Sequence, residues 1–171
     1  MLKLHDILRA GTIQRWHIVN TARQQTLAEH QFNTAILTQA ICTRMGVAQD
    51  VTMRCTLLAL VHDAGECKTG DIPTPAKKLL RKELGPKLDK VLGQFDVEQT
   101  DELPRTLKHV LKCADYLDSM LFLQENKVGR HAEFVLADIM ASGLAYFESC
   151  GDIGAIARDL YYELSNAVYQ I

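Results

Sequence analysis

The chain has 171 residues, of which 47% are hydrophobic and 23% are charged, a composition that suits one folded domain and excludes a disordered chain. Its 19 Lys and Arg residues against 21 Asp and Glu residues give a formal charge of −2, which argues against a general nucleic-acid coat. The sequence has no apolar run of about 18 residues, as a membrane span requires, and charges lie where a signal peptide is apolar. We therefore expect a cytoplasmic protein.

Apolar residues recur at intervals of three and four along most of the sequence, which is the spacing of a helix face and not of a strand. We predict an all-α fold, a single bundle of seven or eight helices that forms one domain over residues 1–171. A polar, irregular stretch is expected at residues 14–25. The predicted helices, in chain order, span residues 2–9, 26–45, 51–64, 75–83, 87–99, 104–127, 131–149 and 152–169.

Local signals mark where several of these helices begin. Thr26 and Glu29 have the spacing of a capping box at the start of the second helix. Asp50 is expected to cap the third helix, because a short acidic side chain accepts hydrogen bonds from free N–H groups at a helix start. Thr74 is expected to cap the fourth helix, with Pro75 at its first helical position.

Two side chains that are costly to bury directly follow an apolar run. The run is residues 57–61, the next residues are His62 and Asp63, and Glu66 comes three residues later. An unpaired charge inside a protein is strongly destabilising, so these groups require partners. A divalent cation is one such partner, because imidazole nitrogen and carboxylate oxygen together suit zinc, manganese, cobalt or iron.

Further candidate ligands lie on other predicted helices. His30 is in the second helix, and Asp115 lies in a patch of apolar and small residues of the helix at 104–127. Helical bundles build metal sites from side chains on different helices. Each residue also has an ordinary structural interpretation, since a single histidine is commonly satisfied in a helical core and a single aspartate commonly lies at the surface. Spacing alone leaves both interpretations open.

Several short strings occur in this order along the chain: Arg15-Trp16, Glu29-His30, HDAGE at residues 62–66, TGDIPTP at residues 69–75 and Ala114-Asp115. With these strings the chain resembles the HD-domain phosphohydrolase superfamily, in particular its branch of bacterial 5′-deoxynucleotidases. Its length and the spacing from Arg15 to Asp115 are still more similar to those of dATP triphosphohydrolases from phages that replace adenine with 2-aminoadenine. The resemblance covers residues 10–120; after that only a helical pattern continues.

The resemblance implies a metal centre with four ligands, His30, His62, Asp63 and Asp115. The implied cofactor is a divalent transition metal, with zinc expected first and cobalt or manganese as alternatives. A second ion, such as magnesium, is compatible with the same site. The implied chemistry is hydrolysis of a phosphate ester by a water molecule that the metal activates.

Two further acidic residues are implied to take part in catalysis. Glu66, about one helical turn after His62, would orient or deprotonate the water, or protonate the leaving oxygen. Asp71 would assist from a loop, through a second ion or through contacts to the ligands. Alternatively, Asp71 is a turn residue in the segment 70–73, a position that suits aspartate equally well.

By the same resemblance, five residues bind the substrate. The Arg15 guanidinium would bind phosphate oxygens, and the Trp16 indole would contact the deoxyribose, although large aromatic side chains usually lie in cores. Ile18 would form an apolar wall near purine C2, where it disfavours an exocyclic amine. Lys77 and Lys112 would hold phosphates; otherwise such lysines form a solvated face.

The implied function is metal-dependent hydrolysis of deoxynucleotides, chiefly of dATP to deoxyadenosine and triphosphate, which would deplete dATP during replication of a 2-aminoadenine phage genome. One alternative is a 5′-deoxynucleotidase acting on monophosphates; His17, where the bacterial enzymes are expected to have proline, favours the phage enzyme. A catalytically silent module that binds a nucleotide or a partner protein is the alternative of another class. We expect a deoxynucleotide as partner, no nucleic acid, no membrane, and a homo-oligomer of two or more chains.

Overall fold

The computed structural model describes residues 4–84 and 104–167, and the predicted helix at 87–99 lies outside them. Within the described residues the chain is helical without named strands, so the predicted all-α fold is confirmed. None of these helices is long and apolar enough to cross a membrane. The elements are α1 (Leu4–Ile7), the 3₁₀-helix η1 (Ala10–Thr12), α2 (Leu27–Arg44), α3 (Gln49–Ala59), α4 (Glu66–Thr69), α5 (Thr74–Leu84), α7 (Arg105–Asn126), α8 (Gly129–Ser149) and α9 (Asp152–Ser165).

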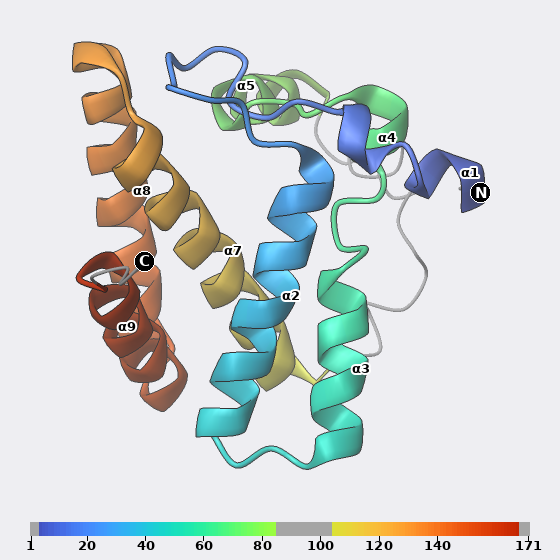
Figure 1. The fold of residues 1–171 in the computed structure, drawn as a ribbon, viewed down its shortest axis with the longest axis vertical. Helices are drawn as coiled ribbons and strands as arrows, with labels where there is room; N and C mark the ends of the chain where they lie inside the picture. Colours follow the sequence, from blue (N-terminus) through green and yellow to red (C-terminus); the bar gives the residue numbers. More distant parts are fainter. Residues whose placement is uncertain (1–3, 85–103, 168–171) are drawn as a thin grey trace.

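The helices α2 and α7 form the centre of the bundle. α2 packs against α3 and α7, and α7 packs against α8 and α9 (Figure 1). α1, η1, α4 and α5 gather at the end of the bundle where α2 begins and α3 ends. The start of α2, the turn after α3 and the middle of α7 can therefore bring their side chains together at one place.

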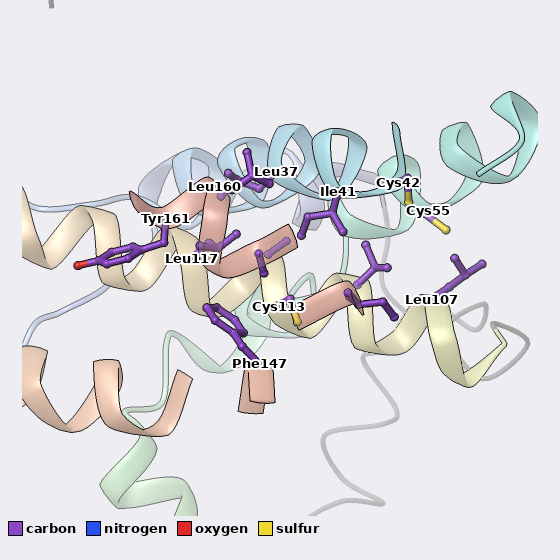
Figure 2. Close-up of a cluster of buried hydrophobic side chains, with 14 of the residues drawn as sticks. Leu37, Ile41, Cys42, Cys55, Leu107, Cys113, Leu117, Phe147, Leu160 and Tyr161 are labelled. Atoms are coloured by element: carbon purple, nitrogen blue, oxygen red, sulfur yellow. The ribbon is translucent and has the colours of Figure 1, made fainter. Parts of the chain in front are cut away.

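The largest apolar core lies between α2, α3, α7, α8 and α9 (Figure 2). Ile41, Leu117 and Phe147 are fully buried there, and burial of each such side chain contributes about 1.5–3 kcal/mol. Gly154 lets α9 begin close against the end of α8, because a Cβ at this position would lie 1.7 Å from the carbonyl oxygen of Phe147. This core holds the central helices, and thereby their polar side chains, in fixed register.

The predicted caps are only partly correct. The Thr26 side chain accepts a hydrogen bond from the Glu29 N–H at 3.1 Å, which confirms the predicted cap of α2. The cap predicted at Asp50 is wrong: Ala48 is the N-cap of α3, and Asp50 lies inside the first turn. An acidic side chain there still interacts favourably with the positive end of the helix dipole. Thr74 is the first residue of α5 rather than its cap.

The end of α3 also differs from the prediction, and the turns that follow it hold two of the predicted site residues. α3 ends at Ala59 and does not continue to residue 64, and the His62 imidazole donates to the Ala59 carbonyl at 2.7 Å. Tight turns follow, and the short helix α4, which the sequence pattern did not predict, begins at Glu66. These turns direct His62 and Asp63 inward instead of along a continuing helix.

Candidate metal centre

Four side chains from three segments converge at the end of the bundle. His30 lies on α2, His62 and Asp63 lie in the turn after α3, and Asp115 lies on α7. Nε2 of His30 is 3.4 Å from Oδ1 of Asp115 and 3.6 Å from Oδ2 of Asp63, and Nε2 of His62 is 3.3 Å from Oδ2 of Asp63. Tetrahedral zinc ligands about 2.0–2.1 Å from the ion are about 3.4 Å apart. The structure brings His30, His62 and Asp115 into a group whose ligand atoms all lie within 4.8 Å of one another, and it places Asp63 beside both Nε2 atoms.

The outer nitrogens of both imidazoles are held by hydrogen-bond acceptors. Nδ1 of His62 donates to the Ala59 carbonyl at 2.7 Å, and Nδ1 of His30 donates to Oδ2 of Asp118 at 2.6 Å. A hydrogen on each Nδ1 leaves the Nε2 lone pair for a metal. Both Nε2 atoms are buried and lack a hydrogen-bond partner within the described residues. A divalent cation would satisfy both nitrogens, so the donor set fits the metal.

The cluster carries a strongly negative field. Burial, and next the charge of Arg15, lower the pKa of His30. Close contacts with the carboxylates of Asp115, Asp118 and Asp63 outweigh both effects and raise this pKa to about 10. A field that holds a cationic imidazole so firmly also favours a metal cation.

The two ligand carboxylates are correspondingly easy to ionise. Burial raises the pKa of Asp115, but the charge of Lys112 and the close contact with His30 outweigh it and hold this pKa below its usual range. Burial also acts on Asp63, and there the charge of His62 is the main opposing effect, leaving the pKa well below its usual value. Both carboxylates are therefore ionised at neutral pH, as metal ligands must be.

Glu66 lies beside the ligands at the start of α4. Its Oε1 accepts a hydrogen bond from Lys77 Nζ at 2.8 Å, whereas Oε2 is buried and has no hydrogen-bond partner among the residues that the structure describes. Burial raises the pKa of Glu66 to about 7; the charge of Asp63 adds to this effect and Lys77 opposes it. A carboxyl group with such a pKa can release or accept a proton near neutral pH.

Asp71 and Lys112 each interact with one acidic residue of this centre. Asp71 is in the loop before α5, largely buried, with Oδ2 3.8 Å from Nδ1 of His17, and its charge contributes to the raised pKa of Glu66. Lys112 Nζ lies 2.6 Å from Oδ2 of Asp115, one turn along α7. Together with Lys77, Lys112 places positive charge directly against the carboxylates of the cluster.

The predicted residues Arg15, Trp16 and Ile18 lie on the segment that connects η1 to α2. The Arg15 side chain is largely buried, and its guanidinium lies 3.7 Å from Oδ2 of Asp118. Trp16 stacks on Phe122, with ring centroids 6.0 Å apart, and has a φ of 61°, a left-handed conformation that costs a residue with a side chain about 1–2 kcal/mol. Ile18 is 52% exposed, so its face is open to a ligand.

Asp118 is the residue that sequence reasoning missed. Its side chain is almost fully buried and accepts hydrogen bonds from His30 Nδ1, from Gln25 Nε2 at 2.8 Å and from Asn33 Nδ2 at 2.8 Å. Its position three residues after Asp115, on the same face of α7, is the sequence signal that points to it. Gln25 carries no comparable signal, because only the folded chain brings it to Asp118.

The helical fold and the His-Asp centre define a metal-dependent phosphohydrolase of the HD type. The chain belongs to the 5′-deoxynucleotidase YfbR-like family, whose sequence profile matches residues 4–149. This confirms the predicted superfamily and the predicted class of enzyme.

Similar sequences carry two related names. The chain is 36% identical over 135 residues to the dATP triphosphohydrolase of Salmonella phage PMBT28, covering 74% of this chain and 69% of that protein. It is 36% identical over 132 residues to the dATP triphosphohydrolase of cyanophage S-2L, covering 75% of this chain and 73% of the relative. The 5′-deoxynucleotidase of Shewanella oneidensis is 27% identical over 174 residues, covering 84% and 88%.

Solved structures share the fold. The cyanophage S-2L HD phosphohydrolase DatZ, solved with dA and one catalytic Zn²⁺ ion, superposes with a TM-score of 0.83 and 26% identity over 98% of this chain and 99% of that one. A Pyrococcus horikoshii protein superposes with a TM-score of 0.59 at 19% identity, a likeness of fold alone. The zinc of DatZ and the His30–His62–Asp115 cluster agree with the predicted transition-metal cofactor.

Proposed function

We propose that this chain hydrolyses dATP to deoxyadenosine and triphosphate. The observation that carries the proposal is the pair of buried Nε2 atoms of His30 and His62, which face two ionised carboxylates beside a buried arginine. This arrangement holds a metal next to an anion-binding group. The phage dATP triphosphohydrolases that the chain resembles, and the dA and Zn²⁺ of DatZ, support the choice of substrate and metal.

The ligands of the metal would be His30, His62, Asp63 and Asp115. A bound divalent cation supplies Lewis-acid activation of water and of the phosphoryl oxygens, and a site for a second ion such as magnesium remains part of the proposal. Nδ1–H bonds to Ala59 and Asp118 hold both imidazoles in the tautomer that ligation needs. The chain therefore fixes the ligand geometry before substrate arrives.

In the reaction, the water oxygen bonds to the α-phosphorus, the bond from that phosphorus to O5′ breaks, and O5′ gains a proton. Glu66, with a pKa near 7, would accept the proton of the water or donate one to O5′. Lys77 holds Oε1 of this carboxylate at 2.8 Å, which leaves Oε2 for the proton transfer. Asp71, whose charge acts on Glu66, would assist in orienting the water.

Substrate binding is assigned to the groups around the metal ligands. Arg15, whose NH1 is buried without a hydrogen-bond partner among the described residues, would bind a phosphate oxygen. The Trp16 indole would pack on the deoxyribose, and Ile18 on the purine edge near C2. Lys77 and Lys112 would offset the charge of the outer phosphates. A buried guanidinium nitrogen left unpaired is costly, and a bound phosphate removes that cost.

A 5′-deoxynucleotidase acting on monophosphates is the second candidate, and the family profile favours it. Both activities break the same bond between phosphorus and O5′, so the same metal ligands and Glu66 serve either one. The difference lies in how many phosphates the cations of the site accommodate. We propose further that residues 1–171 form one domain, assemble as a homo-oligomer, bind no nucleic acid, and act in the host cytoplasm to deplete dATP for a 2-aminoadenine genome.

Product analysis tests the proposal. Zinc-loaded protein and a His62→Ala variant are incubated separately with each dNTP, each dNMP and ATP, and nucleosides and phosphates are resolved by ion-exchange chromatography. We expect deoxyadenosine and intact triphosphate from dATP, well above dGTP and ATP, and none from the variant. Orthophosphate released only from monophosphates would assign the chain to the second candidate. If the wild type turns over no substrate faster than the His62→Ala variant with zinc, cobalt or manganese, the catalytically silent binding module is the hypothesis that remains.

A further inference from the structure

A continuous line of hydrogen bonds joins the Trp16 indole to a metal ligand. Trp16 Nε1 donates to Oε1 of Gln25 at 2.9 Å, Gln25 Nε2 donates to Oδ2 of Asp118 at 2.8 Å, and the same oxygen accepts from His30 Nδ1 at 2.6 Å. One carboxylate oxygen therefore serves both the amide that holds the indole and the imidazole that holds the metal. The line crosses from the segment before α2 to α7 and back to α2.

The line is isolated from solvent along its inner part. Gln25 and His30 are fully buried and Asp118 is 3% exposed, so water does not replace a broken bond there. Hydrogen bonds in such surroundings polarise one another, and a change in one donor alters its neighbours. Gln25 is thus placed to transmit a change at His30 to the indole.

The indole itself depends on this contact. Trp16 has a left-handed backbone conformation, which persists only where the surrounding structure holds it. Its ring is fixed from two directions, by stacking on Phe122 and by the bond to Gln25, and the Arg15 N–H donates to the Gln25 carbonyl at 2.8 Å. Gln25 therefore controls both the backbone next to Trp16 and the ring.

We infer that Gln25 and Asp118 are positioning residues that couple the Trp16 indole to the metal ligand His30, so that metal binding and ligand binding at the indole strengthen each other. A ligand held at Nε2 would fix the His30 ring, and with it Oδ2 of Asp118 and the Gln25 amide that donates to the same oxygen. By linkage, a ligand that fixes the indole tightens metal binding by the same factor. The consequence for catalysis rests on the proposed function, in which the indole contacts the deoxyribose.

Trp16 is the only tryptophan, so tryptophan emission, excited selectively over the five tyrosines, reports on it alone. The test titrates metal-free protein with Zn²⁺, which as a d¹⁰ ion has no d–d absorption to quench the indole. Tryptophan emission is recorded, and zinc affinity is measured in parallel by competition with a chromogenic chelator. We expect zinc to change the emission of the wild type, and deoxyadenosine to tighten zinc binding.

Gln25→Leu removes the bond to the indole, and Asn33→Leu is its matched control, because each deletes one amide donor to Asp118 but only Gln25 reaches Trp16. We expect both variants to change zinc affinity similarly, and only Gln25→Leu to lose the emission response and the effect of deoxyadenosine. Asp118→Asn should weaken zinc binding about 10- to 100-fold.

An unchanged emission response in Gln25→Leu, or zinc binding without any response in the wild type, overturns the inference. A direct field effect of the ion would survive in Gln25→Leu, so that variant separates the two causes. If the wild type hydrolyses dATP but deoxyadenosine does not change its zinc affinity, the coupling alone is refuted. If deoxyadenosine tightens zinc binding to the wild type but the wild type releases no deoxyadenosine from any nucleotide, the proposed function alone is refuted.

Discussion

Replacing Lys112 by methionine separates a triphosphate-binding site from a monophosphate-binding one. Lys112 Nζ lies 2.6 Å from Asp115 Oδ2, at the edge of the metal centre, and its side chain is 48% exposed. Methionine keeps the length of the side chain and removes the charge. The lost pairing with Asp115 affects every substrate equally, whereas the lost contact to an outer phosphate affects only the triphosphate.

The size of the selective effect follows from the exposure of the lysine. A hydrogen bond between charged groups contributes about 1.5–3 kcal/mol, and solvent screening of a half-exposed lysine lowers this to about 1 kcal/mol. About 1 kcal/mol corresponds to a roughly fivefold change in kcat/KM. We therefore expect two unequal effects of Lys112→Met. The factor by which it lowers kcat/KM for dATP should be about five times the factor by which it raises the inhibition constant of dAMP.

The assay measures kcat/KM for dATP from release of deoxyadenosine, and the inhibition constant of dAMP as a competitor, at fixed zinc and ionic strength. Lys108→Met is the control, because it removes the same charge from α7 one turn further from Asp115. Equal losses for dATP and dAMP in Lys112→Met would show that Lys112 acts only through Asp115. That result would refute its assignment to the outer phosphates.

Three other changes test separate parts of the site and the fold. Removing the charge in Lys77→Met should raise the pKa of Glu66 further, moving the Glu66-dependent limb of the pH–rate profile to higher pH, while Lys77→Arg should leave it in place; an unmoved limb would contradict the pairing. Ile18→Ser should narrow the preference for dATP over dGTP, measured as a ratio of kcat/KM, with Ile18→Val preserving it; equal ratios in all forms would exclude Ile18 as a base wall. Gly154→Ala should lower the midpoint of thermal unfolding by several degrees, because its Cβ would overlap the Phe147 carbonyl, and an unchanged midpoint would refute that close packing.

The helices of the bundle could be predicted because their signals are local. Apolar spacing and the Thr26–Glu29 capping box identify α2 without any tertiary information, and α7, α8 and α9 follow from the same spacing. The end of α3 could not be predicted in this way. Its apolar run continues to Val61, although the helix ends at Ala59 and His62 donates to the Ala59 carbonyl. His62 and Asp63 pack against His30 of α2, and this tertiary packing overrides the local preference.

The candidate site divides in the same manner. Short motifs predict His30, His62, Asp63 and Asp115; the structure groups His30, His62 and Asp115 and places Asp63 beside both imidazoles. Asp118 belongs to no motif, although its spacing from Asp115 was visible in the sequence. The contacts of Gln25 and Asn33 with Asp118 join positions 85 to 93 residues apart, and nothing local encodes them.

The charge balance explains why cations surround this centre on several elements. Five carboxyl groups lie in or around it, on Asp63, Glu66, Asp71, Asp115 and Asp118. Arg15, Lys77 and Lys112 provide three positive charges from the segment before α2, from α5 and from α7. A triphosphate adds about four negative charges, so these cations alone leave an excess of repulsion. A divalent ion held by the ligands would reduce that excess. The ion would then be needed for tight binding of the nucleotide as well as for its hydrolysis. In the proposed reaction the buried Nε2 atoms of the two histidines would therefore serve binding and chemistry together.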